Sequence, residues 1–539
     1  MPRCVRAGRH RRCVFADVCV FGNSCILAGA DVFAITCILA GADVLAAVAP
    51  ERSMTVELDG ASLRIKDVVA VAVRGDAVTL APAARERMRA HRDVVLEMLE
   101  GGEPIYGLTT GVAERKRVSL GAGDQVRFNR SLLRNHRIAQ GPLASPAVAR
   151  ATMLVLANTF AMGVCGVRPE LAELLISALR EQVVPPMRTL GSVGQADLGP
   201  LADLSAWLVD WAGFELAENE GLALIDTNAF STAASALALA GAEQVIDAMD
   251  VAAALDFEAF AANLNALHPV VAETRPSPGV RSSLANLRAA LAGSTLWQSG
   301  VARNLQDPLT FRCVPQIHGA ARDAIGYTHE TVERELNSSQ GNPVVVLSER
   351  TVVSVGNFDV VAMSAAVDYA RIGLAPAATS AAERTVKLLQ SPFSGLAPGL
   401  SDRPETGDDG LAELAVATQS FAAEARLLAQ PVSYELASTS KAEGIEDRTT
   451  MAPLSARRLD EVVTLLCRIV AVELVVAAQA IDLRRLGTLG RGTAAAYSAV
   501  RERVGPTSVE SPLPDDLEPL VAAVRDGEFS AIVKAPATP

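Results

Sequence analysis

Apolar residues three and four positions apart recur through most of the chain, and this spacing predicts long α-helices. Several of the helical windows are apolar on more than one face, which is typical of helices buried in a multi-helix or oligomeric core. The pattern therefore predicts a mainly α fold, built as a long-helix bundle. The longest windows span residues 229–262, 282–305, 361–389, 411–428 and 456–481.

The region after Met54 begins differently, because residues 55–80 read as short strands separated by turns. Helical spacing follows, with Pro146 and Pro169 standing where helices begin. We therefore expect a small N-terminal α/β part beside the bundle. The predicted organisation is an N-terminal domain over 54–255 and a central and C-terminal helical bundle over 256–539.

The first 53 residues differ in composition from the remainder of the chain. Five of the eight Cys and a cluster of Arg lie there, and an eight-residue sequence starting at Cys25 recurs from Cys37. Asp residues interrupt the apolar stretch, so neither a signal peptide nor a membrane span is predicted. We interpret residues 1–53 as a non-native or disordered leader, included by a start placed upstream of Met54.

Composition and charge narrow the function classes. The 539 residues are 50% apolar and 4% aromatic, and the formal net charge is −12. An acidic chain without a basic stripe does not fit a nucleic-acid binder. The remaining Cys are isolated and the six His are scattered, so we predict reduced cysteines, no metal site and a cytoplasmic protein.

The most informative motif is the loop Gly-Ser-Val-Gly-Gln-Ala-Asp-Leu-Gly-Pro-Leu-Ala over residues 191–202. It resembles the signature of the histidine and phenylalanine ammonia-lyase family, in which Gly-Ser-Val-Gly precedes Ala-Ser-Gly and then Asp-Leu-Ala-Pro-Leu-Ala. In that family the Ala-Ser-Gly triad cyclises and dehydrates to a methylidene-imidazolone (MIO) electrophile. Here Gln195 and Ala196 stand in place of the triad, and neither carries the hydroxyl that must be lost.

Six further blocks resemble the family in the same order, so the resemblance covers nearly all of the chain after Met54. It implies the helical fold of the aromatic amino acid lyases and a homotetramer whose active sites draw residues from several subunits. A small molecule is then the substrate, without nucleic acid or membrane as a partner. The blocks occupy residues 105–111, 157–170, 220–224, 306–316, 335–343 and 356–358.

The resemblance also implies roles for individual side chains. Tyr106, on a Gly-flanked loop, corresponds to the base that removes a β-proton, which requires a lowered pKa near pH 7. Arg312 corresponds to a bidentate clamp on the substrate carboxylate. A core-edge Tyr and an ordinary ion pair are the structural alternatives. Glu424 is predicted to be catalytic, and the other predicted substrate-binding positions are His136, Gln316, Asn357, Phe358 and Glu446.

Three further differences from the family accompany the missing triad. Leu309 replaces a Tyr that helps to stabilise the electrophile, and Asp226 replaces an Asn. Asp226 could bind substrate as a cation site or act as an acid or base, and a carboxyl neighbour such as Glu424 would raise a pKa in the pair. Lys387 interrupts an apolar stretch, as a helix-surface residue or as a buried ammonium with a catalytic role. We expect no MIO group and no other cofactor.

Three functions fit these observations. The preferred prediction is C–N elimination without MIO from a histidine-like or aromatic substrate whose nitrogen is already quaternary, with release of trimethylamine. This resembles ergothionase, a relative that lacks MIO, because a quaternary amine needs no electrophile to leave. The alternatives are a conventional histidine or aromatic amino acid ammonia-lyase, and a non-catalytic relative that assembles with itself or with an active paralogue.

Overall fold

The structure is a computed structural model, and it describes residues 55–121, 123–434 and 444–534. The chain divides into two units, Met1–Ser53 and Met54–Pro539. The leader predicted over residues 1–53, with its five Cys and its repeat, lies outside the described residues. The fold described below is that of the second unit.

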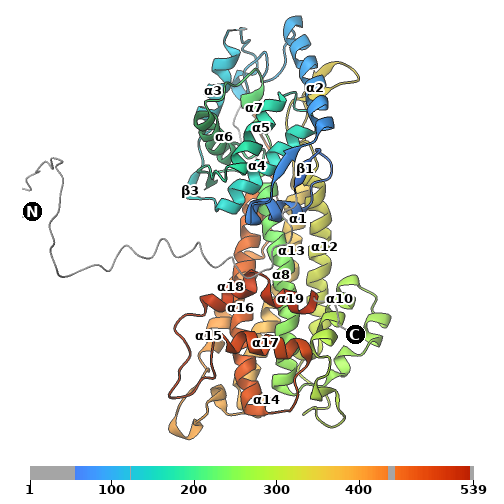
Figure 1. The fold of residues 1–539 in the computed structure, drawn as a ribbon, viewed down its shortest axis with the longest axis vertical. Coiled ribbons are helices and arrows are strands. Elements are labelled where there is room, and N and C mark those ends of the chain that lie inside the picture. Colours follow the sequence, from blue (N-terminus) through green and yellow to red (C-terminus); the bar gives the residue numbers. More distant parts are fainter. Residues whose placement is uncertain (1–54, 122, 435–443, 535–539) are drawn as a thin grey trace, which may run out of the picture. The chain divides into compact units, whose positions relative to one another are not determined.

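Helices dominate the described residues (Figure 1), which confirms the predicted mainly α fold. The α-helices are α1 (Ile65–Val69), α2 (Pro82–Gly101), α3 (Gln125–Asn135), α4 (Pro146–Ala161), α5 (Pro169–Arg180), α6 (Leu198–Ala212), α7 (Glu220–Ala223), α8 (Ala229–Phe260), α9 (Val270–Thr274), α10 (Pro278–Ala290), α11 (Leu309–Arg312), α12 (Val314–Leu336), α13 (Val361–Leu389), α14 (Ser391–Ser394), α15 (Leu414–Leu428), α16 (Ala452–Arg484), α17 (Arg491–Arg501), α18 (Glu518–Arg525) and α19 (Glu528–Lys534). Shorter helical turns are η1 (Ala70–Arg74), η2 (Ala113–Arg115), η3 (Leu264–Leu267), η4 (Thr295–Trp297), η5 (Pro398–Leu400) and η6 (Pro404–Thr406).

The strands are short and pair two by two. β1 (Val56–Leu58) and β2 (Val78–Leu80) are parallel, while β3 (Gln140–Leu143) pairs antiparallel with β4 (Arg188–Leu190). β5 (Val344–Val346) and β6 (Thr351–Val353) form a third, antiparallel pair. The strands expected over residues 55–80 are therefore β1 and β2, with α1 and η1 between them.

Sequence periodicity located several helices closely. The window 361–389 coincides with α13, and Pro146 and Pro169 begin α4 and α5 as predicted. The helix expected over 282–305 is wrong in its second half, because α10 ends at Ala290 and Gly293 adopts a φ of +86°. α12 was not predicted, since polar side chains interrupt its apolar spacing.

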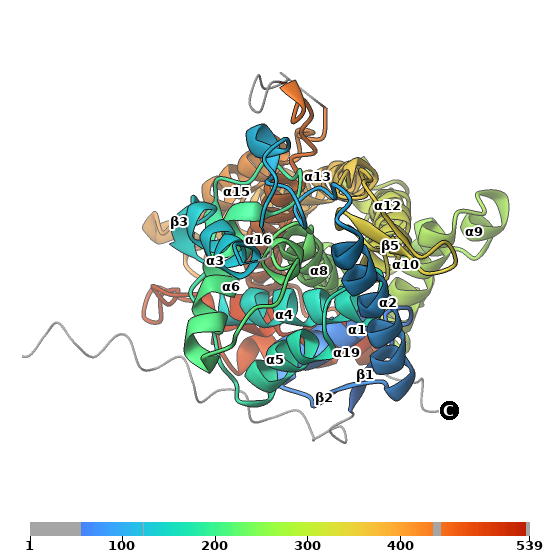
Figure 2. The same cartoon turned by 90° about the horizontal axis from the view of Figure 1, so that it is seen from above.

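α8 is the central helix of the bundle. Figure 2 shows it surrounded by α4, α10, α12, α13 and α16. By length and composition it could cross a membrane, but 67% of its most apolar segment is buried inside the bundle. The helix is continuous from Ala229 to Phe260, so the predicted boundary between residues 255 and 256 falls within it.

α12 runs antiparallel to α8, as contacts at both ends show. Gln340, just beyond the end of α12, donates to Thr232 near the start of α8 at 3.0 Å. His318, near the start of α12, lies 2.8 Å from Asp250 in the second half of α8. The two helices therefore pack along most of their lengths.

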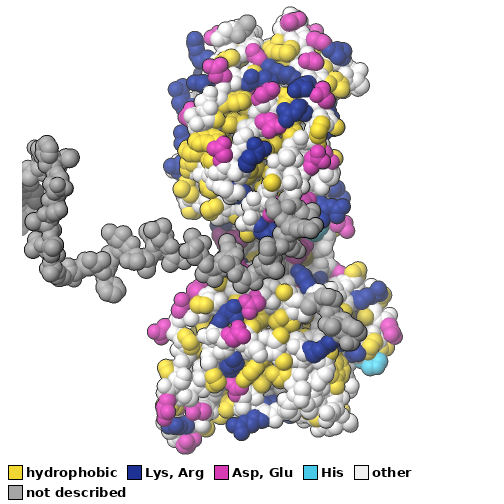
Figure 3. All heavy atoms as spheres, viewed as in Figure 1, with side chains coloured by type: hydrophobic (Ala, Val, Ile, Leu, Met, Phe, Trp, Pro, Cys, Tyr) yellow, Lys and Arg dark blue, Asp and Glu magenta, His cyan; other side chains and the backbone are white. Residues whose placement is uncertain are grey.

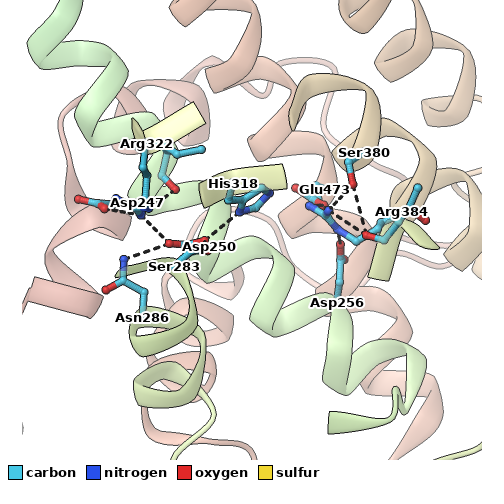
Figure 4. Close-up of polar contacts among 12 residues, drawn as sticks. Asp247, Asp250, Asp256, Ser283, Asn286, His318, Arg322, Ser380, Arg384 and Glu473 are labelled. Atoms are coloured by element: carbon cyan, nitrogen blue, oxygen red, sulfur yellow. Dashed lines mark hydrogen bonds and ion pairs between the residues drawn. The ribbon is translucent and has the colours of Figure 1, made fainter. Parts of the chain in front are cut away.

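A buried charge network ties α8 to α10 and α12 (Figure 4). Arg322 donates to Asp247 at 2.7 Å and to Asp250 at 2.5 Å. Burial alone would raise the pKa of Asp250, but Arg322 and His318 outweigh burial and lower this pKa to about 2. Asp250 is therefore an ionised carboxylate inside the bundle, satisfied by its partners.

A second buried group lies further along α8, where Arg384 of α13 meets two acidic side chains (Figure 4). Its Nε lies 2.9 Å from Asp256, and its Nη2 lies 2.6 Å from Glu473 of α16. Burial and the negative charge of Glu473 raise the pKa of Asp256 well above its usual value. Asp359 before α13 and Thr450 before α16 meet the loop beside the start of α8, whereas Arg384 and Glu473 meet near its end. Both helices therefore run parallel to α8.

Charged side chains of both signs are interspersed on the face shown in Figure 3, with hydrophobic patches between them. Exposed large apolar side chains are also found along α13 and α15, including Tyr369, Ile372, Val416 and Leu427. A groove of about 590 Å³ opens beside them, lined by residues of α11, α12, α13 and α15. Apolar surface of this kind is typical of a face that another protein chain covers.

Candidate active site

Segments far apart in sequence converge on the loop over residues 191–197. The carbonyl oxygen of Gly194 accepts hydrogen bonds from Asn228 Nδ2 at 3.0 Å and from Thr450 Oγ1 at 2.8 Å. The next residue, Gln195, forms an isolated antiparallel bridge with Asp359. The loop is thus held between the start of α8, the turn before α13 and the turn before α16.

Asp197, a residue of the same loop, holds it in place through hydrogen bonds of its backbone and side chain. Its backbone N–H donates to the carbonyl of Thr227 at 2.7 Å, and its carboxylate accepts from the N–H and hydroxyl of Ser231 at 2.7 and 2.8 Å. Ser192 Oγ donates to the same carboxylate at 3.2 Å. Burial raises the pKa of Asp197 to about 6, although these hydrogen bonds oppose the shift.

Asp226 lies directly beside this loop and is half-buried. Burial raises the pKa of its carboxyl to about 7, the N–H of Asn342 opposes that shift, and the negative charge of Glu446 adds to it. Glu446 is also half-buried. The acidic neighbour expected from the sequence was Glu424, and the structure brings Glu446 to Asp226 instead.

Tyr106 lies near Asp226 and Glu446, because the negative charges of both carboxylates contribute to the pKa of its phenol. Its oxygen accepts a hydrogen bond from the N–H of Ala113 at 2.9 Å. Burial raises the pKa of Tyr106, the Ala113 hydrogen bond opposes this shift, and the two carboxylates raise the pKa further. This direction is opposite to the one that a phenol acting as a base near neutrality needs.

Cys165 is a neighbour of Asp226 that the sequence pattern did not single out. Its thiol is buried, and burial, with a contribution from the charge of Asp226, raises its pKa to about 12. The thiol is therefore protonated and inert as a nucleophile. Its isolated position in the sequence, between Gly-rich turns, carried no signal for this placement.

His136, Phe358 and Asn357 lie on the same side of the molecule as this cluster. His136 ends α3, and its Nδ1 lies 2.8 Å from the carbonyl of Leu132. A carbonyl only accepts, so Nδ1 carries a proton and Nε2 keeps a free lone pair when the ring is neutral. Phe358 is half-buried and Asn357 is exposed, and both precede Asp359, the bridging partner of Gln195.

The other predicted site residues lie elsewhere in the chain. Arg312 ends α11, and neither its buried Nε nor the buried Oε1 of Gln316 has a hydrogen-bond partner. Lys387 on α13 donates to Glu383 at 2.7 Å, and its Nζ lies 6.0 Å from the ring centre of Phe393. Glu424 is exposed on α15.

The length of α8 separates these two groups of residues. A helix of 32 residues spans about 48 Å. Asp226 precedes its first turn, whereas Phe311, the neighbour of Arg312, stacks on Phe260 at its last residue, with ring centroids 4.2 Å apart. Tyr106 and Arg312 of one chain therefore lie at opposite ends of the bundle and cannot contact one substrate molecule together.

The helical fold, the collinear motifs and this cluster define a member of the aromatic amino acid lyase family. The family model for aromatic amino acid lyases matches residues 63–210 and 208–502, so the chain belongs to this family. Family membership supports a carbon–nitrogen lyase.

The individual relatives include histidine ammonia-lyases and an ergothionase. The chain is 34% identical to histidine ammonia-lyase from Symbiobacterium thermophilum over 506 residues, covering 90% of this chain and 99% of that relative. Among solved structures, ergothionase from Treponema denticola, an ergothioneine-degrading enzyme, has a TM-score of 0.81 at 25% identity and covers 90% of this chain and 100% of its own. Histidine ammonia-lyase from Trypanosoma cruzi has a TM-score of 0.80 at 27% identity, covering 90% and 96%.

Proposed function

We propose that this protein eliminates a substituted amine from a betaine of a histidine-like or aromatic amino acid, without an MIO group. The substrate is a small molecule whose amino nitrogen is quaternary, and the products are trimethylamine and an α,β-unsaturated acid. The observation that carries this proposal is the loop at Gln195 and Ala196, where neither residue is a Ser, together with Asp226 at the position of a family Asn.

The residues of this loop do not fit the chemistry that forms MIO. The backbone nitrogen at the position that would close the ring, that of Asp197, already donates to Thr227. The nearest hydroxyl, that of Ser192, belongs to the preceding Gly-Ser-Val-Gly and is bonded to the carboxylate of Asp197. A protein with this loop needs a substrate whose leaving group departs without a covalent electrophile.

The elimination then requires a base, a carboxylate clamp and a leaving group. The base removes a β-proton, the C–H electrons form the C=C bond, and the C–N bond breaks with its electron pair leaving on neutral trimethylamine. Tyr106 is the base that the family resemblance implies. Asp226, with a pKa of about 7, is better matched to proton abstraction near neutrality than a phenol whose pKa is raised.

We propose that the enzyme is a homotetramer in which the substrate carboxylate is bound by Arg312 of another subunit. The separation of Tyr106 and Arg312 along α8 supports this arrangement, as do the unpartnered Nε of Arg312 and the exposed apolar side chains of α13 and α15. A guanidinium held in this way can take a carboxylate in two parallel hydrogen bonds. Lys387 and Glu424 would also act from that second subunit.

The proposal is tested with the full chain and four substrates: histidine, phenylalanine, tyrosine and a thiol-histidine betaine. Ultraviolet absorbance of the unsaturated product reports turnover. Turnover of the betaine alone supports the proposal. Turnover of a free amino acid contradicts it, and silence on all four favours a non-catalytic relative that assembles with a partner subunit.

A conventional histidine ammonia-lyase is the second candidate, and the 34% identity to a relative of that name favours it. It requires an electrophile for the ammonium group, which the loop residues do not supply. Turnover of histidine with release of ammonia would establish it in the same assay.

A further inference from the structure

The side-chain amide of Gln195 is the unexplained group at this site. Its Oε1 is buried and has no hydrogen-bond partner among the described residues. A buried amide oxygen without a donor costs free energy, so proteins rarely keep one without a ligand or water to satisfy it. The backbone around it is fixed by the Asp359 bridge and the Gly194 hydrogen bonds, so the side chain is presented by a rigid loop.

A second unsatisfied acceptor lies beside Gln195. Asn228 is fully buried and uses its Nδ2 on the carbonyl of Gly194, the residue before Gln195, which leaves its Oδ1 without a partner among the described residues. A ligand that satisfies this set has to donate hydrogen bonds, because carbonyl and carboxylate oxygens accept them.

We propose that Gln195 determines ring specificity by accepting a hydrogen bond from a ring N–H of an imidazole-type substrate. This inference rests on the proposed function in one respect. The quaternary nitrogen of a betaine has no N–H, so the ring nitrogen is the donor that remains. Gln195 thus occupies the place of the lost triad as a substrate-contacting residue, and a phenyl ring, which has no N–H, does not satisfy it.

The test compares the binding of two ligands by titration calorimetry, the trimethylated betaines of histidine and of phenylalanine. In Gln195→Met the side chain keeps its length and loses the acceptor, so we expect the histidine betaine to bind about three- to tenfold more weakly. The phenylalanine betaine should change by less than about twofold, since no hydrogen bond is lost. Gln298→Met makes the same change at an exposed position and should alter neither affinity.

Equal weakening of both ligands, or no change for either, overturns the inference, because the amide would then act only through the loop or through a water molecule. Gln195→Asn withdraws the oxygen by one methylene and should give the same discrimination if Gln195→Met does not fold. If Gln195→Met weakens only the histidine betaine but no betaine is turned over, the proposed function is wrong and the inference stands. If a betaine is turned over but Gln195→Met affects both ligands alike, the inference is wrong and the proposed function stands. Binding of neither betaine by the unmodified protein would overturn both.

Discussion

Asp226 and Glu446 come from distant parts of the sequence, and the charge of Glu446 helps to raise the pKa of Asp226 to about 7. Two carboxyls that share one neighbourhood rarely ionise together without a compensating cation. The protonation of Asp226 therefore changes near pH 7, about one unit above that of Asp197 in the neighbouring loop. It affects both the stability of the fold and the chemistry of the site.

The stability consequence is tested with Asp226→Asn. Because the folded pKa lies above the unfolded value of 3.8, the native state binds more protons between about pH 4 and 7, and stability falls as the pH rises through that window. An amide cannot ionise, so at pH 8 the variant should be more stable by about 1 kcal/mol or more, with an upper limit of about 4 kcal/mol. Denaturant unfolding at pH 4.5 and pH 8 measures this, and Asp515→Asn, at an exposed position, should show no such gain.

The identity of the base is tested by comparing Asp226→Asn with Tyr106→Phe under betaine turnover. If Asp226 takes the proton, its variant should lose about 10²–10⁴-fold in kcat together with the rise of activity through pH 7. Tyr106→Phe should keep that rise and lose less activity. If the activity of Asp226→Asn still rises through pH 7 and that of Tyr106→Phe does not, the phenol of Tyr106 is the base.

Mixed assemblies test whether the active site crosses subunits. Asp226→Asn and Arg312→Met should each be nearly inactive alone. Refolded together in equal amounts, they should recover activity at about a quarter of the sites, because a random tetramer pairs two intact contributions that often. If mixing recovers nothing while unmodified chains refold normally by the same procedure, Asp226 and Arg312 do not serve one site.

The buried group around Arg384 predicts two unequal substitutions. Arg384→Met leaves Glu473 and Asp256 in the core without a cation, so the free energy of unfolding should fall by about 3–5 kcal/mol. The pKa of Asp256 is raised well above its usual value, so Asp256→Asn removes little charge from the core and should cost less than about 1.5 kcal/mol. Denaturant unfolding at pH 7 compares them, and equal losses would show that Asp256 is ionised.

Gly194 predicts a local steric effect. A Cβ there would lie 2.2 Å from Thr450 Oγ1 and 3.0 Å from the nitrogen of Ala452, at a φ of +85°. Gly194→Ala should therefore cost more than about 2 kcal/mol and abolish activity by displacing the loop. Gly213→Ala meets no atom within 4 Å at a φ of +59° and should cost only about 1 kcal/mol. Similar losses would mean that backbone strain alone accounts for both.

Sequence periodicity predicted the long helices because their apolar faces are continuous, and α13 is the clearest case. It failed for α12, where the buried His318 and the half-buried Arg322 break the apolar pattern. Such residues are stable in the core only through partners on other helices, and a one-dimensional pattern cannot show those partners.

The candidate site was partly predictable for the same reason. Motif order placed Tyr106 and Glu446 among the site residues, and Asp226 was noticed as a departure from the family. The mutual proximity of these three residues depends on turns before α8 and α16, which periodicity does not describe. The sequence singled out Gln195 only because it stands where the family has its Ala-Ser-Gly triad. That its Oε1 has no hydrogen-bond partner could be learned only from the structure.

The hydrogen bonds at Gly194 and Asp197 also bear on the ancestry of the protein. An Ala-Ser-Gly triad is one residue longer than Gln195-Ala196, so regaining it takes an insertion as well as substitutions. An inserted residue would have to fit between Gly194, which is held by Asn228 and Thr450, and Asp197, which is held by Thr227 and Ser231. Single substitutions at Gln195 and Ala196 therefore cannot restore the triad.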